Sequence, residues 1–72
     1  MDAEALQRHQ ELSEACKLRD QLAEQFHMFN QLGQGAHWMI NNRTALEHVV
    51  RTFKKHIDEE PWKSVIIRSD NA

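Results

Sequence analysis

The sequence is poor in the residues that cross-link or interrupt small folds. It contains one cysteine, one proline and two glycines in 72 residues. With Cys16 alone, an intrachain disulfide and a Cys-rich zinc site are both excluded, and we expect a free, inert thiol in a reducing compartment. A chain this short buries a small core, so its folded state is only marginally stable without an additional source of stability. With disulfides and a zinc site excluded, oligomerisation is the source that remains.

Long hydrophobic runs are missing as well. The longest are residues 38–40 and 65–67, far short of the roughly 20 residues that a membrane-spanning helix needs. The N-terminus carries Asp2 and Glu4 and has neither the basic nor the apolar region of a secretory signal. A net charge of −2 does not point to a nucleic-acid partner. These features predict a cytoplasmic protein that does not contact membranes.

Residues 3–32 contain no glycine or proline and are rich in residues that favour helices, which predicts one long helix. Turning each residue by about 100° aligns an apolar stripe along it. The stripe consists of Ala15, Leu18, Leu22, Phe26 and Phe29, with Leu12 and Leu32 at its margins. Glu4, Arg8 and Glu11 fall on the same line. The first ten residues should therefore form a solvated or partner-facing extension of the helix.

Gly33 and Gly35 follow this segment and predict a turn over residues 33–35, because helices commonly end at a glycine with positive φ. A second apolar stripe then predicts a helix over residues 36–59. This stripe consists of Met39, Leu46, Val50, Phe53 and Ile57.

The start of the second helix has two interpretations. The Ser/Thr-x-x-Glu pattern at residues 44–47 is typical of a capping box and favours a start at Thr44. The stripe, however, already includes Met39. We favour the earlier start, with an irregularity near Asn41 and Asn42.

Pro61 ends this helix near Glu60, because proline cannot continue a helix without losing a backbone hydrogen bond. For the C-terminal segment, residues 61–69, the helical spacing of Trp62 and Val65 predicts a short third helix. The β-branched run at residues 65–67 also fits a strand that pairs with an edge in another chain. We favour the helix.

Together these elements predict one all-α domain over residues 1–72, an antiparallel helical hairpin with a short C-terminal segment. A two-helix hairpin has a single shared seam, so its surplus apolar side chains should require a homodimer, most simply a twofold four-helix bundle. The residues assigned to the core or dimer interface are Leu18, Leu22, Phe26, Phe29, Leu46, Val50, Phe53 and Ile57.

The candidate catalytic and metal-binding patterns are weak. Glu24 and His27 have the Glu-x-x-His spacing of di-iron bundles, but both project away from the apolar stripe. His9 and Cys16 lie about 10 Å apart along one helix, too far for the histidine to activate the thiol. The sequence therefore predicts no enzyme, no metal and no cofactor.

Basic residues along the second helix suggest nucleic-acid binding as an alternative function. Acidic residues four positions away should neutralise most of them, in the pairs Arg43–Glu47, Glu47–Arg51, Lys54–Asp58 and Lys55–Glu59. Affinity for nucleic acid depends on uncompensated positive charge, so we rank this function second. Its candidate residues are Arg43, Arg51, Lys54, Lys55 and Arg68, with Lys63 beside them.

Three consecutive apolar residues, Trp38, Met39 and Ile40, cannot all face one helical seam. At least one needs a second apolar surface, which is either another chain or the C-terminal segment folded back. We predict a non-enzymatic interaction protein, such as an accessory regulator, inhibitor, adaptor or small chaperone, that docks on another protein. The predicted partner-binding residues are Trp38, Ile40, Trp62, Val65 and Ile67.

Overall fold

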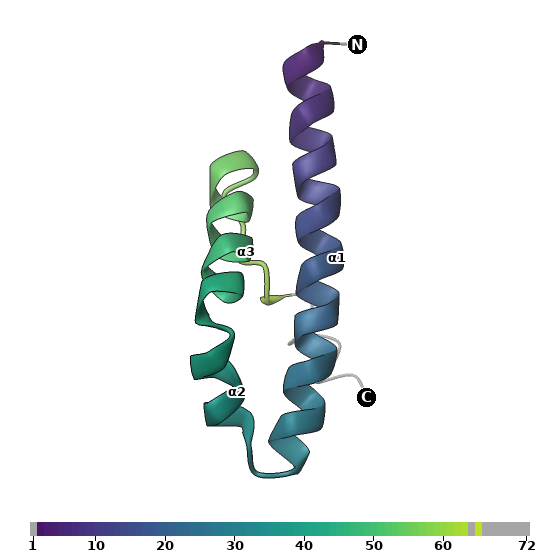
Figure 1. Cartoon of the computed structure of the whole chain (residues 1–72). Helices are drawn as coiled ribbons and strands as arrows, with labels where there is room; N and C mark the ends of the chain where they lie inside the picture. Colours follow the sequence, from purple (N-terminus) through teal and green to yellow (C-terminus); the bar gives the residue numbers. More distant parts are fainter. Residues whose placement is uncertain (1, 64, 66–72) are drawn as a thin grey trace.

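A computed structural model describes residues 2–63 and 65, and all regular structure in this part of the chain is helical. Helix α1 spans Ala3–Gln31, α2 spans Gly35–Asn41 and α3 spans Arg43–His56. The predicted all-α class is confirmed. The chain reverses after α1, so that α2 and α3 lie beside it and run back toward its N-terminal half (Figure 1).

Local signals account for both ends of α1. Asp2 caps its start, where the carboxylate accepts a hydrogen bond from the Glu4 backbone N–H at 3.3 Å. At its end Gly33 has a φ of 75°, a conformation that glycine adopts without strain. The Gln34 N–H then donates to the Phe29 carbonyl at 2.8 Å, which closes the turn toward α2.

The single helix expected over residues 36–59 is two helices that meet at Asn42. The Asn42 backbone has φ −110° and ψ 16°, and its side-chain Nδ2 donates to the Trp38 carbonyl at 2.8 Å. The Trp38 carbonyl also accepts the Asn42 backbone N–H at 3.0 Å, and the Asn42 carbonyl accepts the Leu46 N–H at 3.0 Å, so backbone hydrogen bonds continue across the junction. The alternative start at Thr44 lies one residue after the observed start of α3 at Arg43, but the N-cap residue is Asn42 and its side chain makes no capping hydrogen bond.

Helix α3 also ends earlier than expected, at His56 rather than near residue 59. The N–H groups of Ile57 and Asp58 both donate to the Phe53 carbonyl, at 2.9 and 3.0 Å. Asp58 has a φ of 51°, in the left-handed region that a continuing helix does not use. The chain therefore turns away from the helix axis several residues before Pro61.

Five apolar residues form the buried core between the helices: Ala15, Leu22, Trp38, Val49 and Phe53. Of the residues predicted for the core, Leu18, Phe26 and Leu46 pack around this cluster, and Val50 is half-buried. Val49, outside the predicted stripe, is fully buried. Val49 lies four residues before Phe53 and therefore shares the buried face of α3 with it, whereas Val50 lies at the margin of that face.

The C-terminal segment folds back on the helices. Pro61 is fully buried, and Trp62 packs against the core cluster. Arg19 of α1 reaches the segment, donating from Nη1 to the Pro61 carbonyl at 3.5 Å, with its guanidinium 5.6 Å from the Phe53 ring centre. Lys63 and Val65 have helical backbone conformation. The rest of the predicted third helix, and of the alternative strand at 65–67, lies outside the described residues.

Candidate functional site

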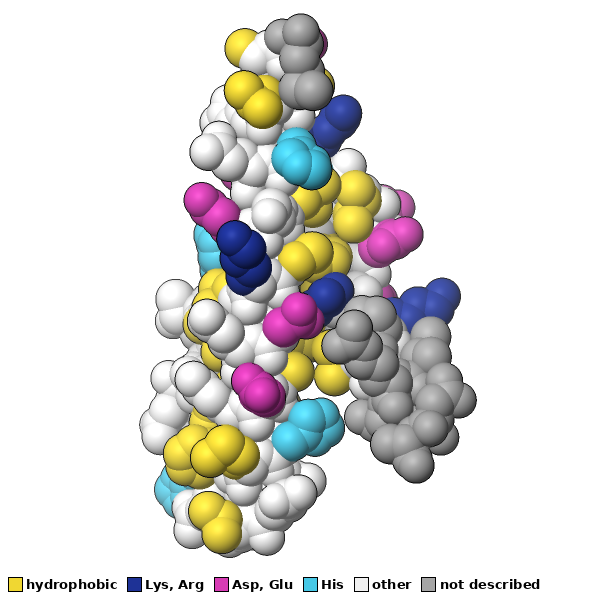
Figure 2. Space-filling model, turned by 90° about the vertical axis from the view of Figure 1, so that its right-hand side faces the viewer, with side chains coloured by type: hydrophobic (Ala, Val, Ile, Leu, Met, Phe, Trp, Pro, Cys, Tyr) yellow, Lys and Arg dark blue, Asp and Glu magenta, His cyan; other side chains and the backbone are white. Residues whose placement is uncertain are grey.

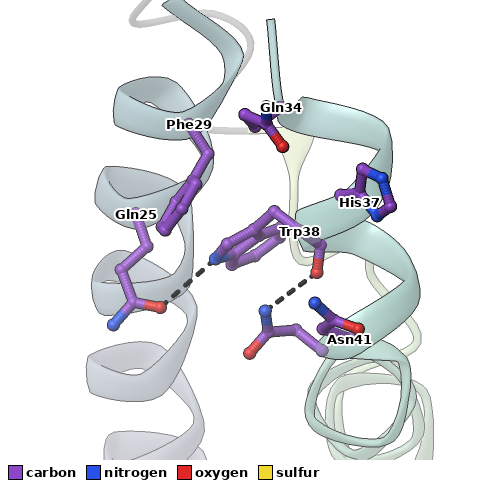
Figure 3. Close-up of a pocket in the computed structure, with 7 residues that line it drawn as sticks. Gln25, Phe29, Gln34, His37, Trp38 and Asn41 are labelled. Carbon is purple, nitrogen blue, oxygen red and sulfur yellow. Dashed lines mark hydrogen bonds between the residues drawn. The ribbon is translucent and has the colours of Figure 1, made fainter. Parts of the chain in front are cut away.

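Trp38, predicted to be an exposed anchor for a partner, belongs to the core instead. It is 5% exposed, and its ring packs edge-on against Phe26 with the centroids 5.6 Å apart. Its indole Nε1 donates to the Gln25 side-chain oxygen at 3.4 Å (Figure 3). Trp38 therefore packs inside its own chain, against α1.

The other predicted partner-binding residues are not brought together on one surface. Ile40 lies on α2 and is 73% exposed. Trp62 and Val65 are half-buried in the C-terminal segment. Ile67 lies outside the described residues. Only Ile40 presents a large apolar side chain to solvent in the described part of this set.

The strongest surface feature is a segment without charge. Residues 25–42 contain no Asp, Glu, Lys or Arg, although the chain carries 20 such residues. This segment comprises the end of α1, the turn and α2, and we call it the uncharged end. Figure 2 shows hydrophobic and histidine side chains there, but no acidic or basic ones. The exposed large apolar residues of the uncharged end are Met28, Phe29, Leu32, Met39 and Ile40.

Helical periodicity does not identify most of the exposed apolar residues of the uncharged end. Periodicity identifies residues that face an apolar surface, and it assigned Phe29 to the core or the dimer interface; in the single copy that side chain is 41% exposed. Ile57, assigned in the same way, is 42% exposed. The charge-free run itself was visible in the sequence and would have located the surface without any assumption about helix phase.

A shallow hollow of about 460 Å³ opens on the uncharged end, between α1 and α2 (Figure 3). Side-chain amides and aromatic rings line it, and it has no ionised wall. The lining residues are Gln25, Phe29, Gln34, His37, Trp38, Asn41 and Asn42. This hollow suits neutral groups that combine apolar surface with hydrogen-bonding capacity.

A second hollow, of about 450 Å³, lies between α1 and α3, and we call it the charged groove. Its α1 wall carries Glu11 and Glu14, and its α3 wall carries Arg51, Lys55 and His48. The remaining lining residues are Ala15, Leu18 and Thr52. The two walls therefore have opposite charge.

Glu11 joins the walls at one end of the charged groove. His56 Nε2 donates to Glu11 Oε2 at 2.5 Å, and Lys55 Nζ lies 3.8 Å from the same oxygen. The hydrogen bond from His56, together with the charge of Lys55, lowers the pKa of Glu11 from its ordinary value of 4.5. The contact links the N-terminal half of α1 to the last turn of α3.

The basic residues of α3 are less neutralised than the sequence predicts. Arg43 pairs with Glu47 at 3.0 Å, as expected. Because α3 ends at His56, the pairs of Lys54 and Lys55 with residues 58 and 59 do not form within the described ranges. Arg51 and Lys54 have no ion pair with any described residue, and Lys55 turns to Glu11 instead. Arg68 lies outside the described residues, and Lys63 is exposed.

The described residues hold no group of three or more His, Cys, Asp or Glu side chains that could bind a metal ion. Glu24 and His27 are both exposed on α1. None of the helices in residues 2–63 has the length and hydropathy needed to cross a bilayer.

No protein-family model, curated protein or solved structure matches this chain significantly. The assignment of function therefore depends on the two surfaces described above.

Proposed function

We propose that this protein is a small non-enzymatic interaction module, of the regulator, inhibitor, adaptor or chaperone type, that docks on another protein through its uncharged end. The observation that carries this proposal is the coincidence of five exposed large apolar side chains with a segment that has no ionised residue. Of the sequence-predicted anchors, Ile40 belongs to this surface.

The composition of the uncharged end is that of an interface centre. Such centres are depleted in charged residues and enriched in methionine and aromatic side chains, because burying an unpaired charge is costly. Met28 and Met39 are both at least half exposed here. Their flexible thioethers adapt to differently shaped apolar partners. The neighbouring amide-lined hollow supplies hydrogen-bonding groups at the edge of the same surface.

We further propose that the chain is an antiparallel helical hairpin that pairs with a second copy into a four-helix bundle. The support is the apolar surface that one copy leaves in solvent, including Phe29 and Ile57 from the predicted dimer set. A chain of 72 residues gains stability from burying such surface. The cytoplasmic location predicted from the sequence belongs to the same proposal.

Docking through the uncharged end is tested by affinity capture from an extract with immobilised protein, followed by quantitative mass spectrometry. Ile40→Asp and Leu32→Asp each place a charge in the proposed interface, and each should reduce capture of specific proteins at least about tenfold. Leu6→Asp is the matched control, because Leu6 is exposed on α1 outside the uncharged end. Leu6→Asp should capture the same proteins as the wild type. If Ile40→Asp and Leu32→Asp also capture them undiminished, the proposal is wrong.

Nucleic-acid binding is the second candidate function, and the unpaired Arg51 and Lys54 within the described chain favour it. It ranks lower because Glu11 and Glu14 line the same groove as Arg51 and repel phosphate. Fluorescence anisotropy with a labelled duplex at several salt concentrations tests it. If this function is the true one, the double variant Arg51→Gln, Lys54→Gln lowers the slope of log affinity against log salt by about 2.

A further inference from the structure

We infer that the second copy docks face to face on the side of the hairpin that carries the charged groove, with the twofold axis parallel to the helices. This inference rests on the proposed self-association and names the face and the symmetry that the proposal leaves open. It does not depend on the docking role of the uncharged end.

The hollow at the uncharged end and the charged groove lie on the same side of the hairpin. We call the hollow at the uncharged end the amide hollow. On α1, Glu11 and Leu18 line the charged groove, and Gln25 lines the amide hollow. These residues are seven apart, and a seven-residue step is close to two full helical turns. On the returning helices, Asn41, His48 and Lys55 repeat the same spacing. One continuous face thus has an uncharged half and a charged half.

The other side of the hairpin is already occupied. The C-terminal segment lies there, with Pro61 buried, Trp62 against the core cluster and Arg19 bonded to the Pro61 carbonyl. The face with the two hollows carries no such cover from the described residues. It also leaves Phe29 41% exposed at the edge of the amide hollow.

Charge decides which partner fits this face. Glu14 on the α1 wall and Arg51 on the α3 wall form no ion pair with any residue in the described ranges, although both line the groove. A surface with an acidic strip beside a basic strip is complementary to a second copy of itself. No other occupant is needed to supply the opposite charges.

Charge also decides the direction of the twofold axis. An axis parallel to the helices places α1 of one copy opposite α3 of the other at the same level, so each Glu14 meets an Arg51. It also places the uncharged half of one copy against the uncharged half of the other. An axis perpendicular to the helices would press the charged half against the uncharged half and leave desolvated charges without partners, which is unfavourable.

The test measures solution mass by light scattering over a concentration series with two single variants, Glu14→Lys and Arg51→Glu. Each variant alone places like charges together twice in the symmetric interface, and should weaken the dimer about tenfold or more. An equimolar mixture of the two should restore it, because every contact then joins opposite charges between different chains. Added salt should weaken the wild-type dimer. Glu24→Lys is the control, since Glu24 is exposed on α1 and lines neither hollow.

Dimerisation of the wild type and Glu24→Lys, loss of the dimer in each single variant, and recovery in the mixture establish the face and the axis. Circular dichroism of each variant shows whether its helices are intact, and the recovery in the mixture itself requires folded chains. A dimer that persists in both single variants, or a mixture that stays monomeric, overturns the inferred face. A monomeric wild type overturns self-association, while docking through the uncharged end is judged separately by the Ile40→Asp capture.

Discussion

Glu11 links α1 to α3 through its carboxylate. It accepts the hydrogen bond of His56 and lies near Lys55, and Gln7 donates to its other oxygen at 3.4 Å. These groups favour the ionised carboxylate and lower its pKa from 4.5. A pKa that is lower in the folded than in the unfolded chain stabilises the fold above the unfolded value. That stabilisation is lost as the pH falls through the lowered value.

Glu11→Gln should therefore lower the denaturant midpoint at about pH 7, where the wild type has the ionised contact. The difference between variant and wild type should shrink as the pH falls below 4.5 and vanish once Glu11 is protonated. Chemical unfolding at a series of pH values measures it, with Glu24→Gln as the exposed control. A gap that stays constant down to about pH 2 would show that the carboxylate's charge contributes nothing.

Trp38 gives a second prediction at this scale. Trp38→Ala removes the largest side chain of the buried core and should cost about 3–5 kcal/mol. A domain of this size has a total stability of about 4–11 kcal/mol, so much of the helical signal in circular dichroism should be lost at 37 °C. Met39→Ala, at an adjacent exposed position, should change the stability by less than about 0.5 kcal/mol. Equal effects of the two substitutions would contradict the burial of Trp38.

Individual residues also show which core positions and contacts the sequence predicts and which it does not. The stripe correctly placed Leu22 and Phe53 in the core, because both lie in regular stretches of helix. It omitted Val49, because positions 49 and 50 both lie within a turn of Leu46 and Phe53 and the spacing alone does not choose between them. It could not find the contact of Glu11 with His56, which joins residues 45 positions apart. The projection places Glu11 on the apolar line, but this indicates only the point where the apolar seam begins, not a contact with the other helix.

At the scale of elements, the end of α1 was predictable to within one residue, because glycine after a long uninterrupted segment is a local signal. The end of α3 was not predictable in the same way. The local signal used for it, Pro61, lies five residues after His56, where the helix ends. The helix stops where Asp58 adopts a left-handed conformation, which its sequence does not require.

The turn between α1 and α2 provides a prediction for an element. Gly33→Ala introduces a Cβ at a φ of 75° and should cost about 1 kcal/mol, whereas Gly33→Asn should cost less because asparagine tolerates this region. No atom lies within 4 Å of the added Cβ, so the cost is purely conformational. Thermal unfolding should rank the proteins in the order wild type, asparagine, alanine. Equal midpoints would mean that the turn relaxes freely.

At the scale of the molecule, the C-terminal segment completes the core of a single copy. Trp62→Ala should destabilise the protein by about 2 kcal/mol, because the ring packs against the buried cluster but is only half-buried. Lys63→Ala, at the neighbouring exposed position, should be nearly neutral. Denaturant midpoints at fixed protein concentration measure both. A neutral Trp62→Ala would show that the segment covers the helices without stabilising them.

The uncharged end has one more consequence for the whole molecule. Because residues 25–42 have no acidic or basic side chain except His27 and His37, contacts made there at neutral pH respond little to ionic strength. The inferred pairing of two copies through Glu14 and Arg51, in contrast, should weaken as salt screens the charges. A change of salt would then shift the chain between a monomer, whose uncharged end is fully open to a partner, and a dimer, in which the uncharged halves lie against each other. Ionic strength would thus control access to this surface without acting on the surface itself.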